Sequence, residues 1–196
     1  MRLPLSVLAF SAPLASATTY SISVFAPDTV VDGAQLNAAG QSFYTGISGP
    51  STYCPASQGA ACPSTHKTLV YANLAGMAVE VPGGQTVYVQ AGGKVQYTRA
   101  HSSYIPGGSL VGGWRNLTVV SDCAMPLQVL GFAHPADTGG GGGVALCPDI
   151  PDSMGDTGAS YALYAKTAGF NQTNCVDAVG LLLVGDIAEA GSWQYL

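Results

Sequence analysis

Short runs in which hydrophobic and polar residues alternate recur along the chain, and glycine, proline, asparagine or aspartate separates them. Alternation with a period of two is typical of a β-strand that buries one face. The pattern predicts strands at residues 20–25, 42–44, 68–72, 78–81, 86–90, 94–98, 117–121, 127–132, 161–167 and 178–184. The 26 glycines and 12 prolines leave little room for long helices. We therefore expect an all-β protein.

The clearest local element is the segment from Thr86 to Thr98. Two alternating runs flank Ala91-Gly92-Gly93. Glycine adopts positive φ without steric cost, so this short loop can close a β-hairpin.

Many short strands with turn residues at fairly regular spacing are typical of a barrel or a sandwich. The chain is long enough for one sizeable core. We therefore predict a single all-β domain over residues 18–196, folded as a compact barrel of β-trefoil type, with a β-sandwich as the alternative. No internal repeat in the sequence supports the threefold arrangement.

The first 17 residues have the layout of a signal peptide. Arg2 supplies a positive charge, Leu3 to Leu14 form a short apolar stretch, and Ala15-Ser16-Ala17 places small residues before the expected cleavage after Ala17. The apolar stretch is shorter than the roughly 20 residues that a membrane-spanning helix needs. The layout predicts secretion of residues 18–196.

Charge excludes two classes of partner. The chain has 6 basic and 11 acidic residues, and removal of Arg2 with the leader makes it more acidic still. Nucleic acids and anionic membranes are bound by basic surfaces, so we expect neither as a partner. With 9% charged and 47% hydrophobic residues, the composition is also unlike that of a disordered chain.

Five cysteines in an exported chain leave one unpaired in any scheme of intrachain disulfides. Cys54 and Cys62 bracket a short Pro/Ser/Gly/Ala loop, so we pair these first. Cys147 and Cys175 flank a loop and a strand and form the second predicted pair, which leaves Cys123 as a free or buried thiol. Spacing alone does not choose among the pairings. A metal site is a poorer explanation, because the sequence has no Cys-x-x-Cys and its histidines stand alone. We predict no cofactor.

Two Asn-x-Thr sequons begin at Asn116 and Asn171. In a secreted eukaryotic chain they are candidates for N-glycosylation, which places both sites on loops or strand ends.

The sequence contains no nucleophile elbow, zinc-protease helix motif, phosphate-binding loop or dinucleotide fingerprint. Glycosidases use two facing carboxylates, so acidic side chains are the candidates for a hydrolytic site. Asp149, Asp152 and Asp156 cluster on a Pro/Gly-rich segment, which favours a solvated loop over a calcium site. Glu80 lies in a predicted strand, where simple exposure explains it equally well.

Aromatic residues among turn residues give a non-catalytic alternative, because sugar rings stack on tryptophan and tyrosine faces. Trp114, Trp193 and Tyr104 are the candidate glycan contacts. Tryptophan is highly buried on average, so burial of both indoles against the core competes with this interpretation.

Residues 79–108, VEVPGGQTVYVQAGGKVQYTRAHSSYIPGG, resemble the central signature of a family of small secreted fungal proteins, described as IgE-binding or phialide-type cell-wall proteins. A Tyr-Cys-Pro element at 53–55, Cys-Pro at 147–148 and Trp-Gln-Tyr at 193–195 agree with the layout of that family. The resemblance implies a cell-wall or culture-fluid glycoprotein with no established catalysis.

Three functions therefore remain after the sequence analysis. The leading one is a non-catalytic structural or interaction glycoprotein of the fungal cell wall, IgE-binding by resemblance, whose partners are wall polysaccharide or wall proteins. The second is a lectin-like module that binds wall glycan. The third is a secreted carbohydrate-active hydrolase. The sequence leaves the ligand, the oligomeric state and any covalent attachment to the wall open.

Overall fold

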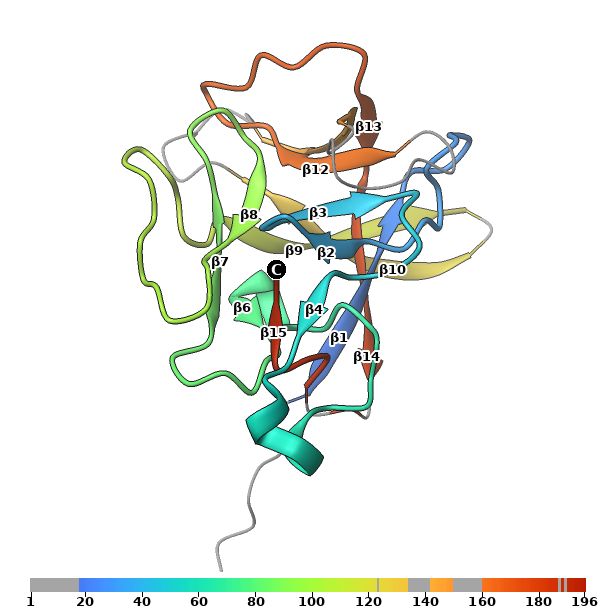
Figure 1. Cartoon of the computed structure of the whole chain (residues 1–196). Coiled ribbons are helices and arrows are strands. Elements are labelled where there is room, and N and C mark those ends of the chain that lie inside the picture. Colours follow the sequence, from blue (N-terminus) through green and yellow to red (C-terminus); the bar gives the residue numbers. More distant parts are fainter. Residues whose placement is uncertain (1–17, 123, 134–141, 150–159, 187, 189) are drawn as a thin grey trace, which may run out of the picture.

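The structure, a computed structural model, describes residues 18–122, 124–133, 142–149, 160–186, 188 and 190–196 (Figure 1). The predicted signal peptide and Cys123 lie outside these residues. Two short 3-10 helices, η1 (Ala56–Ala61) and η2 (Ala72–Leu74), accompany the strands. The strands of the described part are β1 (Thr19–Phe25), β2 (Asn37–Ala39), β3 (Ser42–Thr45), β4 (Thr52–Tyr53), β5 (Val70–Tyr71), β6 (Gly76–Met77), β7 (Gln85–Val89), β8 (Val95–Tyr97), β9 (Trp114–Ser121), β10 (Ala124–Phe132), β11 (Val144–Pro148), β12 (Tyr161–Ala165), β13 (Val176–Ala178), β14 (Gly180–Asp186) and β15 (Gln194–Tyr195). The protein is nearly all β, as predicted.

One large antiparallel sheet holds most of the strands. Its order is β13-β11-β12-β3-β8-β7-β6-β5-β1-β14-β10-β9, with β2 paired to β3, while β15 and β4 form a separate pair. In the part of the chain that the structure describes, β9 does not pair with β13, so no closed barrel is found. The trefoil and sandwich arrangements stay predictions.

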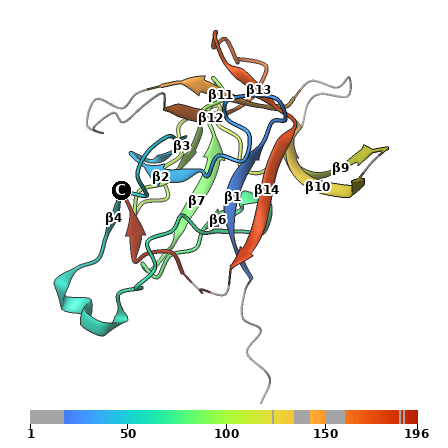
Figure 2. The same cartoon turned by 90° about the vertical axis from the view of Figure 1, so that its right-hand side faces the viewer.

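A two-stranded ribbon of β9 and β10 extends from one end of this sheet. Figure 2 shows it reaching away from the rest of the molecule, beside the paired strands β1 and β14. Within the described residues, β10 and β14 pair at one register position, Leu130 with Leu181. Gly180 allows this approach, because a Cβ there would lie 2.8 Å from a methyl of Val129. Beyond Leu130 and Leu181 the two strands diverge.

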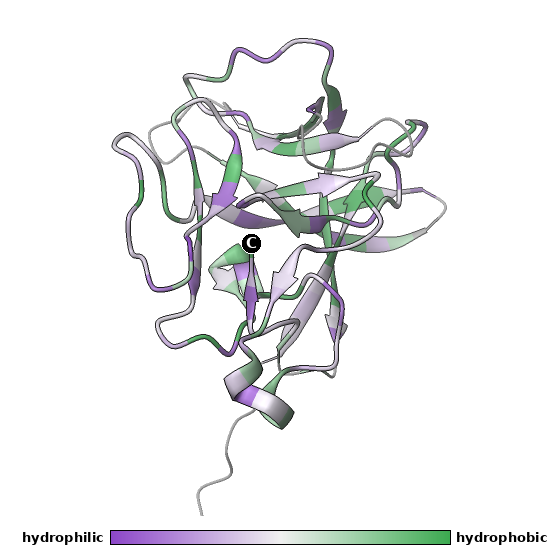
Figure 3. Cartoon of the chain, in the orientation of Figure 1, coloured by the Kyte–Doolittle hydropathy of each residue, from purple (hydrophilic) through white to green (hydrophobic). Residues whose placement is uncertain are grey.

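The core follows the alternation of side chains along the strands. Ile22 and Val24 of β1, Val87 and Val89 of β7, and Val95 and Tyr97 of β8 are all at most 1% exposed. Hydrophobic and hydrophilic residues are correspondingly interspersed along the strands (Figure 3). Burial of one such side chain stabilises the fold by about 1.5–3 kcal/mol.

The predicted hairpin between residues 86 and 98 is confirmed. Strands β7 and β8 pair in antiparallel register, and the amide of Gln90 donates to the carbonyl of Lys94 at 2.9 Å. Ala91, Gly92 and Gly93 form the loop, with Gly93 at φ 94°. A Cβ at Gly93 would lie 2.4 Å from the carbonyl oxygen of Ala165. Glycine is therefore required there by conformation and by space.

One predicted strand is wrong and one substantial strand was missed. Residues 78–81 form no strand, because the preceding pair Gly76–Met77 joins the sheet as β6 and Val79 forms only an isolated bridge with Ser192. Strand β11 (Val144–Pro148) was not predicted, since its first four residues are all buried and do not alternate in polarity. The predicted strand at 178–184 is divided in two at Val179.

Both predicted disulfides are present. Cys54–Cys62 closes the segment that contains η1, and Cys147–Cys175 joins β11 to the segment before β13, across 28 residues of sequence. Cys147 is 2% exposed, so the second disulfide is anchored in a packed strand.

Candidate functional site

The loop that leaves β8 carries a concave surface lined by polar side chains. Thr98 continues the ladder, exchanging hydrogen bonds with Thr86: its amide donates to the Thr86 carbonyl and its hydroxyl accepts from the Thr86 amide, each at 2.9 Å. A turn follows, in which the Ser102 amide donates to the Arg99 carbonyl at 3.1 Å. His101, at φ 59°, sits at the centre of this turn. Such left-handed backbone in a non-glycine residue is enriched at functional sites.

Two hollows lie on either side of His101. The hydroxyl hollow has a volume of about 420 Å³ and is lined by Gly83, Gly84, Thr86, Thr98, His101, Ser102 and Ser103. The arginine hollow has a volume of about 370 Å³ and is lined by Gln41, Arg99, Ala100, His101, Gln194, Tyr195 and Leu196. The imidazole of His101 is therefore common to both.

The buried side chain of Gln85 holds the two sides of the arginine hollow together. Its Nε2 donates to the carbonyls of Thr98 at 2.9 Å and Tyr195 at 3.0 Å, and its Oε1 accepts from the Tyr195 amide at 2.8 Å. Gln85 is 3% exposed, so these bonds satisfy an amide that would otherwise be costly to bury. These three hydrogen bonds of Gln85, called the Gln85 clamp below, fix β15 against the end of β8.

The phenol groups of Tyr97 and Tyr195 add further hydrogen bonds beside the Gln85 clamp. Tyr97 donates to the carbonyl of Leu196 at 2.8 Å, and its ring meets that of Tyr195 edge to face at 6.2 Å. Tyr195 donates to the Lys67 carbonyl at 2.7 Å and accepts from the Leu69 amide at 2.9 Å. Burial raises the pKa of both Tyr97 and Tyr195 far above the ordinary value for a phenol. Both tyrosines are structural groups that stay protonated.

The side chains around the hollows can donate and accept many hydrogen bonds. Arg99 offers a forked guanidinium, His101 an imidazole, and Gln41 and Gln194 each an amide, while serine and threonine supply hydroxyls. Among the described lining residues there is no aspartate or glutamate. The lining can therefore exchange hydrogen bonds with a ligand in both directions, and Arg99 adds a positive charge to it.

The three predicted glycan contacts fall in different environments. Trp114 is 8% exposed and packs edge to face against Phe132 at 5.3 Å, so the competing interpretation holds for it: the indole is buried against the core. Trp193 is half-buried, and its carbonyl accepts from the Val81 amide at 2.9 Å. Tyr104 is 74% exposed and directly follows Ser103 of the hydroxyl hollow.

The acidic candidates do not form a pair within the described residues. Glu80 is exposed, and Asp152 and Asp156 lie outside the described residues. Asp149 forms an ion pair with Lys94, whose Nζ also lies 5.6 Å from the ring centre of Tyr44. Burial, the largest single effect, lowers the pKa of Lys94, but the hydrogen bond to Asp149 and the charges of the surrounding Tyr44, Asp149 and Tyr164 together outweigh it and leave that pKa raised. Lys94 is therefore a structural cation. The described residues contain no cluster of three His, Cys, Asp or Glu side chains that could hold a metal ion.

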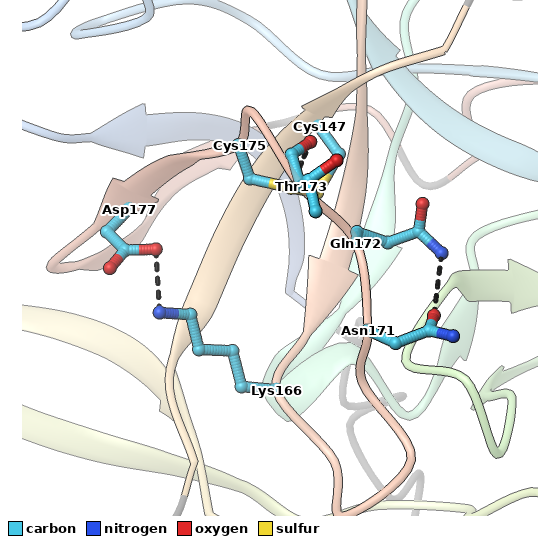
Figure 4. The surroundings of a disulfide bond; sticks show 7 residues. All are labelled: Cys147, Lys166, Asn171, Gln172, Thr173, Cys175 and Asp177. Atoms are coloured by element: carbon cyan, nitrogen blue, oxygen red, sulfur yellow. Dashed lines mark hydrogen bonds and ion pairs between the residues drawn. A yellow bond between two sulfur atoms is a disulfide. The ribbon is translucent and has the colours of Figure 1, made fainter.

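The two sequons differ in their surroundings. Asn171 is exposed in the loop between β12 and β13, where Gln172 donates to its Oδ1 at 3.2 Å (Figure 4). The expectation of a loop or strand end thus holds for Asn171. Asn116 is also exposed but lies within β9, where it pairs with Leu130 of β10. That expectation is wrong for Asn116, which lies inside a strand. It is nevertheless exposed, because β9 is largely solvated on both faces.

Sequence analysis missed Gln85, Arg99 and His101. Two signals pointed to them: all three lie within residues 79–108, and Arg99 and His101 directly follow the predicted hairpin. The hollows themselves arise when residues 194–196 pack beside the loop, a contact across almost 100 positions of sequence.

The sheet and its two disulfides define a disulfide-bonded, all-β protein. A search of curated proteins places it more closely. The chain belongs to a family of fungal secreted proteins that includes one from Arthroderma benhamiae described as "Uncharacterized secreted protein", to which it is 36% identical over 167 residues, 84% of this chain and 79% of that protein.

An extracellular location agrees with this relationship. In the described residues no helix is long and apolar enough to cross a membrane. No family model matches the chain, and no solved structure matches it.

Proposed function

We propose that the protein is a non-catalytic interaction glycoprotein of the fungal cell wall, and that it binds uncharged wall polysaccharide in the hydroxyl and arginine hollows. The observation that carries the proposal is the lining shared through His101: hydroxyl, amide, imidazole and guanidinium groups without an acidic side chain. Such groups exchange hydrogen bonds with sugar hydroxyls in both directions.

The size and placement of the hollows support an extended ligand. Each is comparable to the roughly 300–1,000 Å³ of ordinary ligand sites, and together they form two adjoining subsites. Tyr104, 74% exposed, offers an aromatic face in the same loop on which a sugar ring can stack. A polysaccharide chain would cross His101 between one hollow and the next.

A pull-down with insoluble chitin, β-1,3-glucan and whole fungal wall tests the proposal. The secreted wild-type protein should be retained on at least one of these materials. Arg99→Gln combined with His101→Gly should weaken retention by at least about tenfold, which corresponds to 1.4 kcal/mol. Glycine keeps the positive φ at position 101, so the loop retains its shape.

Arg115→Gln is the matched control, because Arg115 is exposed on β9, away from both hollows. It should leave retention unchanged. Wild-type protein that binds none of the three materials, or equal loss in the control, would contradict polysaccharide binding at this site.

One further property, recognition by IgE, belongs to the same proposal through the family resemblance of residues 79–108. Recognition by IgE is tested by immunoblotting the purified protein with sera from sensitised donors. The alternative is a hydrolytic activity, although the described residues contain no facing pair of carboxylates. It is tested by assaying the same preparation against a broad panel of glycans and esters. Turnover abolished by Glu80→Gln would replace the non-catalytic interpretation.

A further inference from the structure

A third hollow lies where the ribbon of β9 and β10 diverges from β14. This ribbon cleft has a volume of about 220 Å³. Its apolar side is formed by Tyr20, Leu181 and Leu183, which continue the core face of β1 and β14. Its polar side is formed by the amide side chains of Asn73, Asn116 and Gln128.

The sequon residue Asn116 is itself part of this wall. Register places Asn116 opposite Leu130 and Thr118 opposite Gln128, so Asn116, Thr118 and Gln128 share one face of the ribbon. Gln128 donates from Nε2 to the Thr118 hydroxyl at 2.8 Å. Because Asn116 lines the cleft, a group attached to its Nδ2 begins at the cleft wall.

We propose that the ribbon cleft holds the first sugar of an N-linked glycan on Asn116. In this modification the Asn116 Nδ2 forms a bond to C1 of the sugar of a lipid-linked oligosaccharyl diphosphate; the bond from C1 to the diphosphate oxygen breaks, the lipid diphosphate leaves, and Nδ2 loses one proton. The inference does not depend on polysaccharide binding at His101.

The dimensions and chemistry of the cleft suit one acetamido sugar. Its 220 Å³ is below the roughly 300 Å³ at which ordinary ligand sites begin, so one ring fits and the remaining glycan extends into solvent. The less polar face of the ring meets Tyr20 and Leu183, while the amides of Asn73 and Gln128 can bond its hydroxyl and acetamido groups. Asn73 at φ 58° and Leu74 at φ 48° are successive left-handed residues, and Asn73 lines the cleft from this turn.

The same glycan would cover a vulnerable edge. Strand β9 ends the strand order, and no described strand pairs with its other edge. Leu117 and Val120 of this strand are 46% and 73% exposed. An exposed apolar edge is a template for unwanted pairing with another chain, and a bulky polar glycan blocks it.

The test uses protein secreted from a eukaryotic host, with site occupancy measured by peptide mass spectrometry. Endoglycosidase H trims a high-mannose glycan to its first sugar, so treated wild-type protein should keep its Tm. Asn116→Gln removes that sugar as well and should lower Tm by about 2–4 °C, the shift expected for 1 kcal/mol in a chain of this size.

Asn171→Gln is the matched control, since Asn171 is exposed and lines none of the three hollows. It should leave Tm unchanged. Thr118→Ser preserves the sequon and the hydroxyl bonded to Gln128, and should therefore have the glycan occupancy and the Tm of the wild type.

Three results would each overturn the inference: an Asn116 that carries no glycan, a Tm that falls as much after endoglycosidase H as in Asn116→Gln, or equal effects of Asn116→Gln and Asn171→Gln. The enzyme treatment acts on folded wild-type protein, so a Tm that falls after it overturns the inference even if Asn116→Gln is not secreted.

Discussion

At the scale of single residues, the phenol of Tyr195 connects the arginine hollow to the interior. It is bonded to two backbone groups, the Lys67 carbonyl and the Leu69 amide, in a side chain that is 1% exposed. Tyr195→Phe removes one hydroxyl and leaves the buried Leu69 amide and the partly buried Lys67 carbonyl without this partner. We expect a loss of about 1–3 kcal/mol in the free energy of unfolding, measured by urea denaturation. Tyr53→Phe, at a position 51% exposed, should change it little.

The raised pKa of Tyr97 and Tyr195 predicts a decline of stability at high pH. Phenols titrate near pH 10 in the unfolded chain, whereas burial keeps these two protonated in the folded protein. Their contribution is therefore complete below pH 10 and is lost as pH rises above it toward the folded pKa. Urea midpoints at pH 8, 10 and 11 should fall over the last interval, and less steeply in Tyr97→Phe. A pH-independent midpoint would contradict the prediction.

Single residues also show where sequence analysis reaches its limit. The Cys54–Cys62 pair was predictable from its short spacing and loop composition, whereas spacing alone does not choose the partner of Cys147, which the structure shows to be Cys175. Trp114 was open to two interpretations, since only the approach of Phe132 on the neighbouring strand shows that it is buried.

At the scale of elements, the hairpin of β7 and β8 depends on one of its two loop glycines. Gly93→Ala places a Cβ at positive φ and against the carbonyl oxygen of Ala165, and should destabilise the fold by about 2–4 kcal/mol. Gly92→Ala is the paired control, because nothing lies within 4 Å of its Cβ position. Thermal unfolding of the two variants should separate them clearly, and similar Tm values would show that the loop relaxes without cost.

The hairpin was predictable because its signal is local: alternation on both sides of a glycine loop. Strands β6 and β15 contain two residues each, too few to show any period, and they form because distant segments supply partners. Strand β11 lacks alternation because both of its faces are covered, so its pattern resembles any apolar run.

At the scale of the whole molecule, the two disulfides should contribute unequally. Chain-entropy estimates give about 2.5 kcal/mol for closing the short Cys54–Cys62 loop and about 3.6 kcal/mol for the longer Cys147–Cys175 loop. Because Cys147 is also buried in β11, replacing Cys147 and Cys175 together by alanine should lower the urea midpoint more than replacing Cys54 and Cys62. The reverse order would mean that the segment around η1 matters more to stability than its exposure indicates.

In the described residues the ribbon is attached to the rest of the molecule near one end, where Leu130 of β10 pairs with Leu181 of β14 and the Phe132 carbonyl accepts from the Gly143 amide. Amide protons exchange with solvent through local opening, and a unit with few cross-links opens without global unfolding. Backbone amides of β9 should therefore exchange in deuterated water much faster than those of β1, which pairs with β14 at seven positions. Equal protection would mean that the ribbon unfolds only with the whole sheet. With this difference, the molecule combines a stiff sheet with a more flexible ribbon of β9 and β10. The ribbon can bend against a neighbouring surface while the sheet remains intact.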